Sequence, residues 1–207
     1  MNIKIQVPES YDEVSVRQYK TLVDEVAKLD NDHEKALAGL RVLCDIDADI
    51  AVRLPAELMD KIGDALVWLH EAPTGEAHKL QRFVEWEGVT YGFVPDMANL
   101  TVGEFSDLEY YAKEGFYEKL EYVLAVLYRP VVFEKRGYYE VESYSGTKDR
   151  PAMCLDWPMS VALGAMLFFW TTAKALAVDS HSSSTTPLVS LLTPYITSGA
   201  GTKSSIH

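Results

Sequence analysis

The sequence has 207 residues, enough for one large domain or two small ones with a core that folds unaided. Its apolar fraction of 48% and its charged fraction of 24% are ordinary for a globular protein. The formal net charge of −12 argues against a surface that binds duplex nucleic acid, because neutralising phosphates requires clustered Lys and Arg.

The cysteines and the N-terminus bear on the compartment. Cys44 and Cys154 lie far apart in the sequence, and their simplest interpretation is a pair of buried thiols in a reducing compartment. The opening residues Met1–Ile5 lack the apolar run of a signal peptide. We therefore expect the protein to be made in a cytoplasm and to reside there.

Residues 1–72 predict a strand followed by a helical lobe. Apolar residues alternate with polar ones at the start, so a strand is expected from about Asn2 to Val7. Ser15 and Gln18 have the spacing of a capping box, which predicts a helix behind them. Asp32 can cap a further helix that runs to Leu43, and Pro55 fits the first turn of a third. The inner faces of the first and third helices are Val16, Tyr19, Leu22, Val23, Val26 and Leu29, and Leu58, Ile62, Ala65, Leu66 and Leu69.

Residues 73–179 predict a second unit, set apart by the internal linker Ala72–Gly75. Two hairpins are expected in it, Arg82–Trp86 with Thr90–Val94 around Gly88, and Val131–Phe133 with Tyr138–Val141.

Two helices are expected between these hairpins. Thr101 and Glu104 form a second capping box, so the first helix should start near Val102, and Gly115 should break it. The second helix has a stripe of apolar residues at helical spacing, and it should end near Arg129 because a proline follows.

The most apolar segment follows Pro158 and runs from Met159 to Val178. Its length approaches that of a membrane span, but Ser160, Thr171, Thr172 and Lys174 interrupt it and its flanks show no basic asymmetry. A buried core or interface helix is therefore favoured over a membrane helix. Phe168, Phe169 and Trp170 leave this helix little polar face, so a partner protein is one natural cover for it.

The composition changes after Asp179. Ser- and Thr-rich or Gly-rich stretches flank one apolar island, whose members are Leu188, Val189, Leu191, Leu192, Tyr195 and Ile196. Such an island suits a peptide that docks into a groove, and a tail folded back on its own domain is the equal alternative. The candidate partner-binding residues are Phe168, Phe169, Trp170, Leu188, Leu191, Leu192, Tyr195 and Ile196.

These elements predict an α+β fold that is mostly helical, with two short β-hairpins and a long apolar C-terminal helix followed by an extended tail. Three parts are expected: an N-terminal strand and helical lobe over 1–72, a central unit over 73–179, and a flexible or docking tail over 180–207.

Candidate chemical sites in the sequence match their motifs poorly. Asp45–Asp49 resembles the start of a calcium loop, but Ile50 and Ala56 stand where such a loop needs Gly and Glu. His70, Glu71, Glu76 and His78 do not have the spacing of a helical metal motif, and Pro73 interrupts them. The sequence shows no nucleophile elbow and no phosphate loop. We therefore predict no catalytic residues, no cofactor and no metal, and no nucleic acid or membrane as a partner.

Several short motifs, in this order, resemble a family of tailed-bacteriophage proteins described as tail assembly chaperones or virion-associated proteins. The motifs are Ile5–Tyr11, Gln18-Tyr19, Phe83–Phe93 with Gly88 and Tyr91, Leu100–Phe105, Leu127–Pro130, and Gly164-Ala165 before Phe168-Phe169. The resemblance covers most of residues 3–170 and leaves the tail after Asp179 without a counterpart.

The resemblance implies a non-enzymatic bacteriophage morphogenesis protein that binds tail, tape-measure or neck proteins during assembly. The alternative is a structural virion component of the neck, tail or capsid interior, held by its C-terminal arm. The location implied is the host cytoplasm during assembly, or the virion for a structural component, and a homo-oligomer stays open. Two other classes remain as hypotheses: a small hydrolase or metal-dependent enzyme with a site near His70 and His78, and a regulatory binding module of the host or phage.

Overall fold

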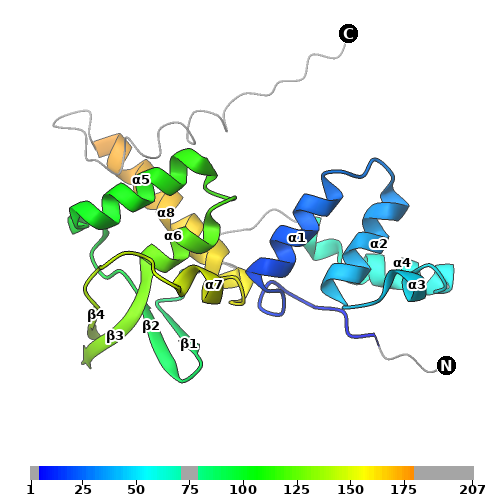
Figure 1. Ribbon diagram of the computed structural model, residues 1–207, viewed down its shortest axis with the longest axis horizontal. Helices are drawn as coiled ribbons and strands as arrows, with labels where there is room; N and C mark the ends of the chain where they lie inside the picture. The colour runs from blue at the N-terminus through cyan, green and yellow to red at the C-terminus, as the bar shows by residue number, and fades with distance from the viewer. Residues whose placement is uncertain (1–4, 71–78, 180–207) are drawn as a thin grey trace, which may run out of the picture.

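The computed structural model of the chain describes residues 5–70 and 79–179 (Figure 1). These residues form an α+β fold of eight helices and one four-stranded antiparallel sheet. The helices are α1 (Val16–Val26), α2 (Asp32–Leu43), α3 (Ala48–Ala51), α4 (Ala56–Ala65), α5 (Val102–Gly115), α6 (Leu120–Leu127), α7 (Arg150–Cys154) and α8 (Met159–Asp179). The strands are β1 (Phe83–Trp86), β2 (Val89–Phe93), β3 (Tyr128–Lys135) and β4 (Tyr138–Val141), and short 3-10 turns cover Val67–His70 and Met97–Asn99.

The two predicted hairpins are parts of one sheet with the order β1-β2-β3-β4. Each turns at a pair of residues with positive φ, Glu87 and Gly88 in the first and Arg136 and Gly137 in the second. Such pairs match the right-handed twist of the flanking strands. The hairpins are joined because β2 pairs with β3 in antiparallel register, with Phe93 opposite Tyr128.

The predicted end of the second central helix near Arg129 is confirmed to within two residues. Helix α6 ends at Leu127, and β3 begins at once with Tyr128. The helix ends here because Pro130 follows, and a residue before proline prefers an extended backbone. Here that extended backbone continues as a strand through Pro130, whose carbonyl accepts a hydrogen bond from the Glu142 amide at 2.8 Å.

The capping boxes are confirmed at both predicted helix starts. The Ser15 and Thr101 side chains each accept a hydrogen bond from the backbone three residues on, and Gln18 and Glu104 reach back to the cap amide. Helix α2 differs, because Asn31 rather than Asp32 caps it.

The predicted strand over Asn2–Val7 is wrong for the residues that the structure describes there. Ile5–Val7 form no strand, and residues 1–4 lie outside the described part of the chain. Ile5 and Val7 instead pack on a small apolar cluster of Leu40, Ile46, Ala51 and Ile62. Burial against helices, rather than pairing with a sheet edge, accounts for their alternating apolar pattern.

Helix α8 is the centre of the largest core cluster, which it shares with α5, α6, the sheet and the segment before α8. It is not the long apolar helix expected from its composition. Its side chains are mostly buried up to Phe169, but Thr171 is exposed and its hydroxyl donates to the carbonyls of Leu167 and Phe168. No helix in the described ranges combines the length and the apolar character that crossing a membrane requires.

The N-terminal helices are attached to this core through reciprocal backbone hydrogen bonds. The first amide of α1, at Val16, donates to the carbonyl of Trp157 at 2.9 Å, and the first amide of α8, at Met159, donates to Val14 at 2.7 Å. The first amide of a helix has no partner within that helix. Here the first amide of each helix is hydrogen-bonded to the segment that leads into the other helix. Figure 1 shows α8 running from this junction away from α1 and α2.

The predicted boundary between the first two parts and the predicted tail over 180–207 fall at residues outside the described ranges. The two cysteines are free; Cys154 is fully buried and Cys44 half-buried, and burial raises the pKa of both thiols.

Candidate protein-binding groove

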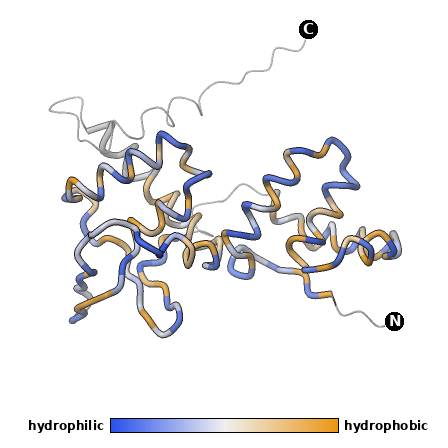
Figure 2. The backbone as a smooth tube through the Cα atoms, in the orientation of Figure 1, coloured by the Kyte–Doolittle hydropathy of each residue, from blue (hydrophilic) through white to orange (hydrophobic). Residues whose placement is uncertain are grey.

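Helices α1, α2 and α4 enclose a groove of about 550 Å³, which we call the α1–α2–α4 groove. Helices α1 and α2 lie side by side, joined by a short connection that has both hydrophilic and hydrophobic residues in Figure 2. Both helices present apolar side chains toward α4, Val26 from α1 and Ala36 from α2 among them. The groove lies where the three faces meet but do not close on one another.

The groove is lined mainly by aliphatic and small side chains, with Tyr19 as its aromatic member. Helix α1 contributes Val23 and Val26 among others, α2 contributes Ala36 and Gly39, and α4 contributes Met59, Ile62 and Gly63. Among all its lining residues only Asp32 and Lys35 carry charge, and they form an ion pair with each other at 3.4 Å. The surface of the groove is therefore apolar, and a charged group on a ligand would meet charge only at the end where Asp32 and Lys35 lie.

Small residues keep the groove open. A Cβ atom added at Gly63 would meet no heavy atom within 4 Å, and one at Gly39 would come no closer than 4.0 Å, to Leu66 Cδ1. Val23 is 36% exposed, although it belongs to the predicted apolar face of α1. The helices therefore leave apolar surface uncovered at the groove, whereas a close-packed interior would fill this space with side chains.

The sequence-predicted partner-binding residues lie elsewhere, where they are described at all. Phe169 is 3% exposed and its ring centroid lies 5.9 Å from that of Phe116. Phe168 is half-buried, with its ring 5.4 Å from that of Phe93. Both phenylalanines thus pack in the chain's own core. The side chain of Trp170 and the residues Leu188, Leu191, Leu192, Tyr195 and Ile196 lie outside the described part of the chain.

The candidate metal sites gain no support from the described residues. Over 5–70 and 79–179, no group of three or more His, Cys, Asp or Glu side chains is placed to hold a metal ion. The side chain of His70 and all of 71–78, including His78, lie outside those ranges. Asp47 stands at the N-cap position of α3, as expected for a capping loop, but its side chain makes no capping hydrogen bond.

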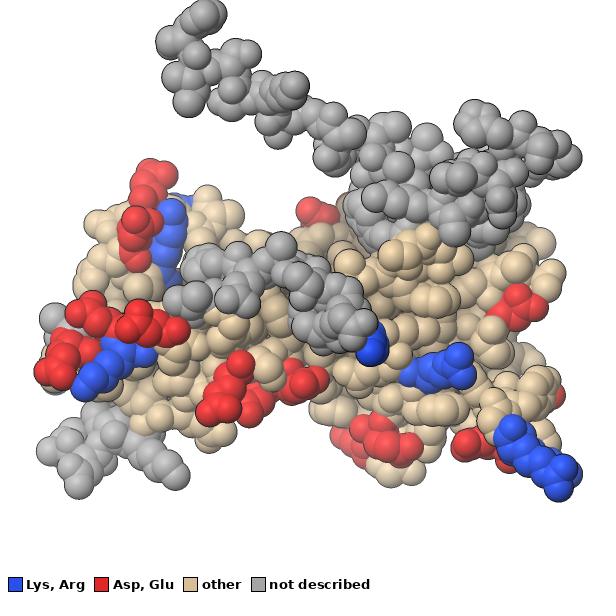
Figure 3. Space-filling model, turned by 180° about the vertical axis from the view of Figure 1, so that it is seen from behind, with Lys and Arg blue, Asp and Glu red and all other residues tan. Residues whose placement is uncertain are grey.

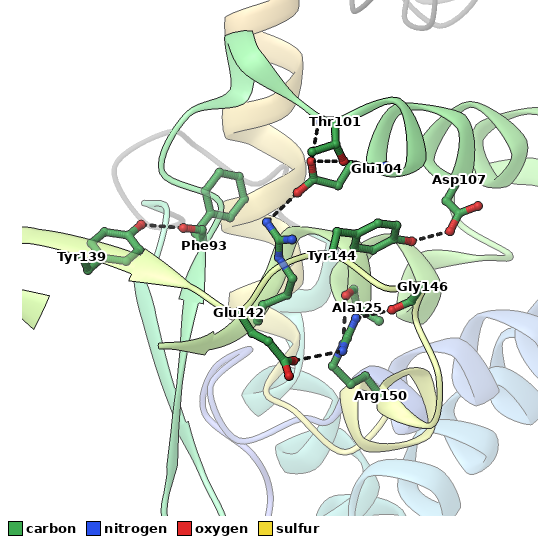
Figure 4. A network of polar contacts seen from close by, with 11 residues as sticks. Phe93, Thr101, Glu104, Asp107, Ala125, Tyr139, Glu142, Tyr144, Gly146 and Arg150 are labelled. Atoms are coloured by element: carbon green, nitrogen blue, oxygen red, sulfur yellow. Dashed lines mark hydrogen bonds and ion pairs between the residues drawn. The ribbon is translucent and has the colours of Figure 1, made fainter. Parts of the chain in front are cut away.

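A buried polar network links α5 to β3 (Figure 4). Glu104 and Arg129 form an ion pair at 2.5 Å, with 3% and 7% of their side chains exposed. The ring of Tyr144 lies 5.6 Å from the Arg129 guanidinium carbon, and the Tyr144 hydroxyl donates to Asp107. Burial lowers the pKa of Arg129, and Glu104 beside it opposes that shift. Burial, reinforced by the bond to Asp107, raises the pKa of Tyr144.

Arg150, the first residue of α7, makes the other polar contacts drawn in Figure 4. Its guanidinium donates to the carbonyls of Ala125 at 3.3 Å and Gly146 at 2.5 Å, and lies 3.8 Å from Glu142. Each charged group in the network has an ionic, hydroxyl or carbonyl partner, although the buried Nε of Arg129 has no hydrogen-bond partner. These contacts fix α5, α6 and the loop before α7. We assign the network to the fold, which leaves the α1–α2–α4 groove as the candidate functional site.

Sequence reasoning missed both features. The apolar spacing along α1 identified Val23 and Val26 as a helix face, and the only signal of a groove was that this face is wider than one neighbouring helix covers. On the face drawn in Figure 3, acidic side chains are scattered, and basic ones form small separate groups.

Comparison with protein-family models, with curated proteins and with solved structures finds no match to this chain.

Proposed function

We propose that this chain is a non-enzymatic bacteriophage assembly protein, similar in role to a tail assembly chaperone, that binds other phage structural proteins through the α1–α2–α4 groove. The observation that carries the proposal is the groove itself, an apolar hollow of about 550 Å³ with charge at one end only. The ordered motifs from Ile5–Tyr11 to Gly164-Ala165 supply the phage context.

The shape and chemistry of the groove favour a helical or extended apolar segment as its occupant. Grooves between helices commonly take one apolar face of an amphipathic helix, with anchors one turn apart. Burying apolar area stabilises such a complex by about 25 cal/mol per Å² before the costs of association. A chaperone would use this term to keep the apolar segments of unassembled tail or tape-measure proteins out of water.

The alternative role is a structural virion component of the neck, tail or capsid interior. The apolar island Leu188–Ile196 supports it, because an arm of that kind would hold a copy against its neighbours in the particle. Mass spectrometry of purified particles separates the roles, since a chaperone leaves the finished virion and a structural component stays at a fixed copy number.

The binding itself is tested by co-expressing the tagged chain with the tail, tape-measure and neck proteins of its phage. Val23→Asp places a charge in the groove at a residue that is already partly exposed, so we expect at least a ten-fold loss of recovered partner. Val102→Asp is the matched control, because Val102 is 84% exposed at the first turn of α5, where an acidic residue is tolerated.

Recovery of a tail or neck protein by the wild type and the control, but not by Val23→Asp, supports the proposal. It fails if none of these proteins is recovered, or if Val23→Asp recovers as much as the wild type.

A further inference from the structure

We propose that the α1–α2–α4 groove is also the docking site for residues 187–196 of a second copy of this chain, so that two copies exchange these segments. The inference concerns the chain's own association and goes beyond the binding of phage proteins. It uses the same groove as the proposed function but requires no other protein, and the two are tested separately.

The chemistry of this segment matches the chemistry of the groove. Its apolar residues recur at i, i+1, i+3, i+4, i+7 and i+8, namely Leu188, Val189, Leu191, Leu192, Tyr195 and Ile196. The first four, Leu188, Val189, Leu191 and Leu192, would share one side of a helical turn, the arrangement that a groove between helices accepts. Pro194 would end that turn, so Tyr195 and Ile196 would follow it as an apolar extension. Pro187 stands immediately before Leu188, at a position compatible with the first turn of a helix.

Charge supports the same pairing. From Ser180 to Thr202 the sequence contains no Asp, Glu, Lys or Arg, although the whole chain carries a formal net charge of −12. The groove is equally poor in charge, with the ion-paired Asp32 and Lys35 as its only charged lining residues. Neither surface would therefore have to bury an unpaired charge when the two meet.

The reach of the chain favours a second copy over the same copy. Helix α8 starts beside α1, where Met159 bonds to Val14, and its 21 residues carry its end about 30 Å away at 1.5 Å per residue. Figure 1 shows that this direction leads away from α1 and α2. The nine residues from Asp179 to Leu188 span at most about 30 Å when fully extended.

Within one copy, those nine residues would therefore have to run fully extended around the molecule merely to bring Leu188 to the near edge of the groove. The rest of the segment would still have to enter it. A segment that comes from a second copy has no such restriction. If each copy gives its segment and receives one, the contact is self-complementary and closes as a two-fold dimer.

The dimer is tested with the purified full chain alone, by light scattering across a dilution series. We expect a wild-type dimer, and at least a ten-fold higher dissociation constant for Val23→Asp in the groove and for the double variant Leu191→Asp/Leu192→Asp in the segment. The matched controls are Val102→Asp and Ser183→Asp/Ser184→Asp, which add the same charges outside the groove and outside the apolar positions and should stay dimeric. Circular dichroism confirms that each variant is folded.

Mixing the two weakened variants tests exchange directly. Each mixed pair keeps one intact groove facing one intact segment, so dimer should reappear in the mixture at a concentration where neither variant dimerises alone. The proposal is overturned if the wild type is a monomer, if either groove or segment variant dimerises as tightly as the wild type, or if mixing restores nothing. None of these results depends on a phage protein, so co-expression can still find a partner for the groove.

Discussion

Glu104 uses its two carboxylate oxygens for two different tasks. One oxygen accepts from the amide and the hydroxyl of Thr101, both at 2.6 Å, and so starts α5. The other pairs with Arg129 in β3 at 2.5 Å. A helix cap that also neutralises a buried guanidinium ties the start of α5 to the sheet, so a change at this residue acts on two elements at once.

Replacing Glu104 with Gln should be strongly destabilising. The amide oxygen can still cap α5, but Arg129 is left as a buried charge without its partner, which costs about 3–5 kcal/mol. Glu109→Gln on the same helix is the control, because its pair with Lys113 is exposed and worth less than about 1 kcal/mol. Urea unfolding of both variants measures the difference, and equal free energies of unfolding would contradict the structural role given to the buried pair.

Helix α8 is positioned by close backbone contact as well as by apolar packing. A Cβ atom at Gly164 would lie 2.6 Å from the carbonyl oxygen of Lys79, so only glycine allows the chain before β1 to pass this close to the helix. The hydroxyl of Tyr128 donates to the backbone carbonyl of Gln81 at 2.7 Å, and the side-chain amide of Gln81 donates to the Ser160 hydroxyl at 3.1 Å. These contacts hold the segment 79–82 against α8.

Gly164→Ala and Gly63→Ala should therefore change stability in opposite directions. Alanine is favoured over glycine inside a helix by about 1 kcal/mol, which Gly63→Ala should gain because its new methyl group meets open space. At Gly164 the new methyl group meets backbone, and overpacking of this kind costs about 1–3 kcal/mol. Thermal unfolding of the two variants gives the signs, and a stabilised Gly164→Ala would show that the approach of Lys79 is not tight.

The sequence predicted the local features of these elements and missed those that depend on distant contacts. The capping boxes at Ser15 and Thr101 and the break at Gly115 were predictable, because each depends on residues within one or two turns. The joining of the two hairpins was not, since it requires Phe93 to meet Tyr128 after two intervening helices. The pairing of Glu104 with Arg129 was hidden for the same reason.

The candidate site was predictable only in part. Val23 and Val26 were identified as apolar positions of α1, but a groove exists only where three helices fail to close, and no local pattern encodes that packing. The phenylalanines predicted to bind a partner show a second limit of the sequence, because a helix face that looks uncovered can be covered by its own chain. Phe169 is covered in this way by Phe116, and the docking segment 187–196 stays a prediction.

At the scale of the whole molecule, tyrosines are distributed through the core and link its parts. Burial is the main cause that raises the pKa of tyrosines from the N-terminal segment, the helices, the sheet and the loop before α7, namely Tyr11, Tyr19, Tyr91, Tyr117, Tyr128, Tyr139 and Tyr144. A buried tyrosine stays neutral in the folded chain at a pH where the unfolded chain has already lost the proton. The free energy of unfolding should therefore fall in alkali, with contributions from every part of the fold that holds one of these tyrosines.

The free energy of unfolding should be independent of these tyrosines below pH 10 and should fall as the pH rises above it. The ordinary tyrosine pKa is 10.0, and a raised pKa in the folded state means that the unfolded state binds fewer protons above that pH. Tyr128 is fully buried, so it alone should remove up to about 1.4 kcal/mol per pH unit.

Tyr128→Phe isolates this contribution. At pH 7 the variant should be less stable than the wild type by about 1 kcal/mol, because it loses the hydrogen bond to the Gln81 carbonyl. Between pH 10 and pH 11 the gap should narrow, since only the wild type loses the stability that a neutral Tyr128 supplies. Urea unfolding at each pH, with tyrosinate absorbance followed in parallel, measures both effects. Two curves that stay parallel through this range would show that Tyr128 ionises in the folded chain as readily as in the unfolded one.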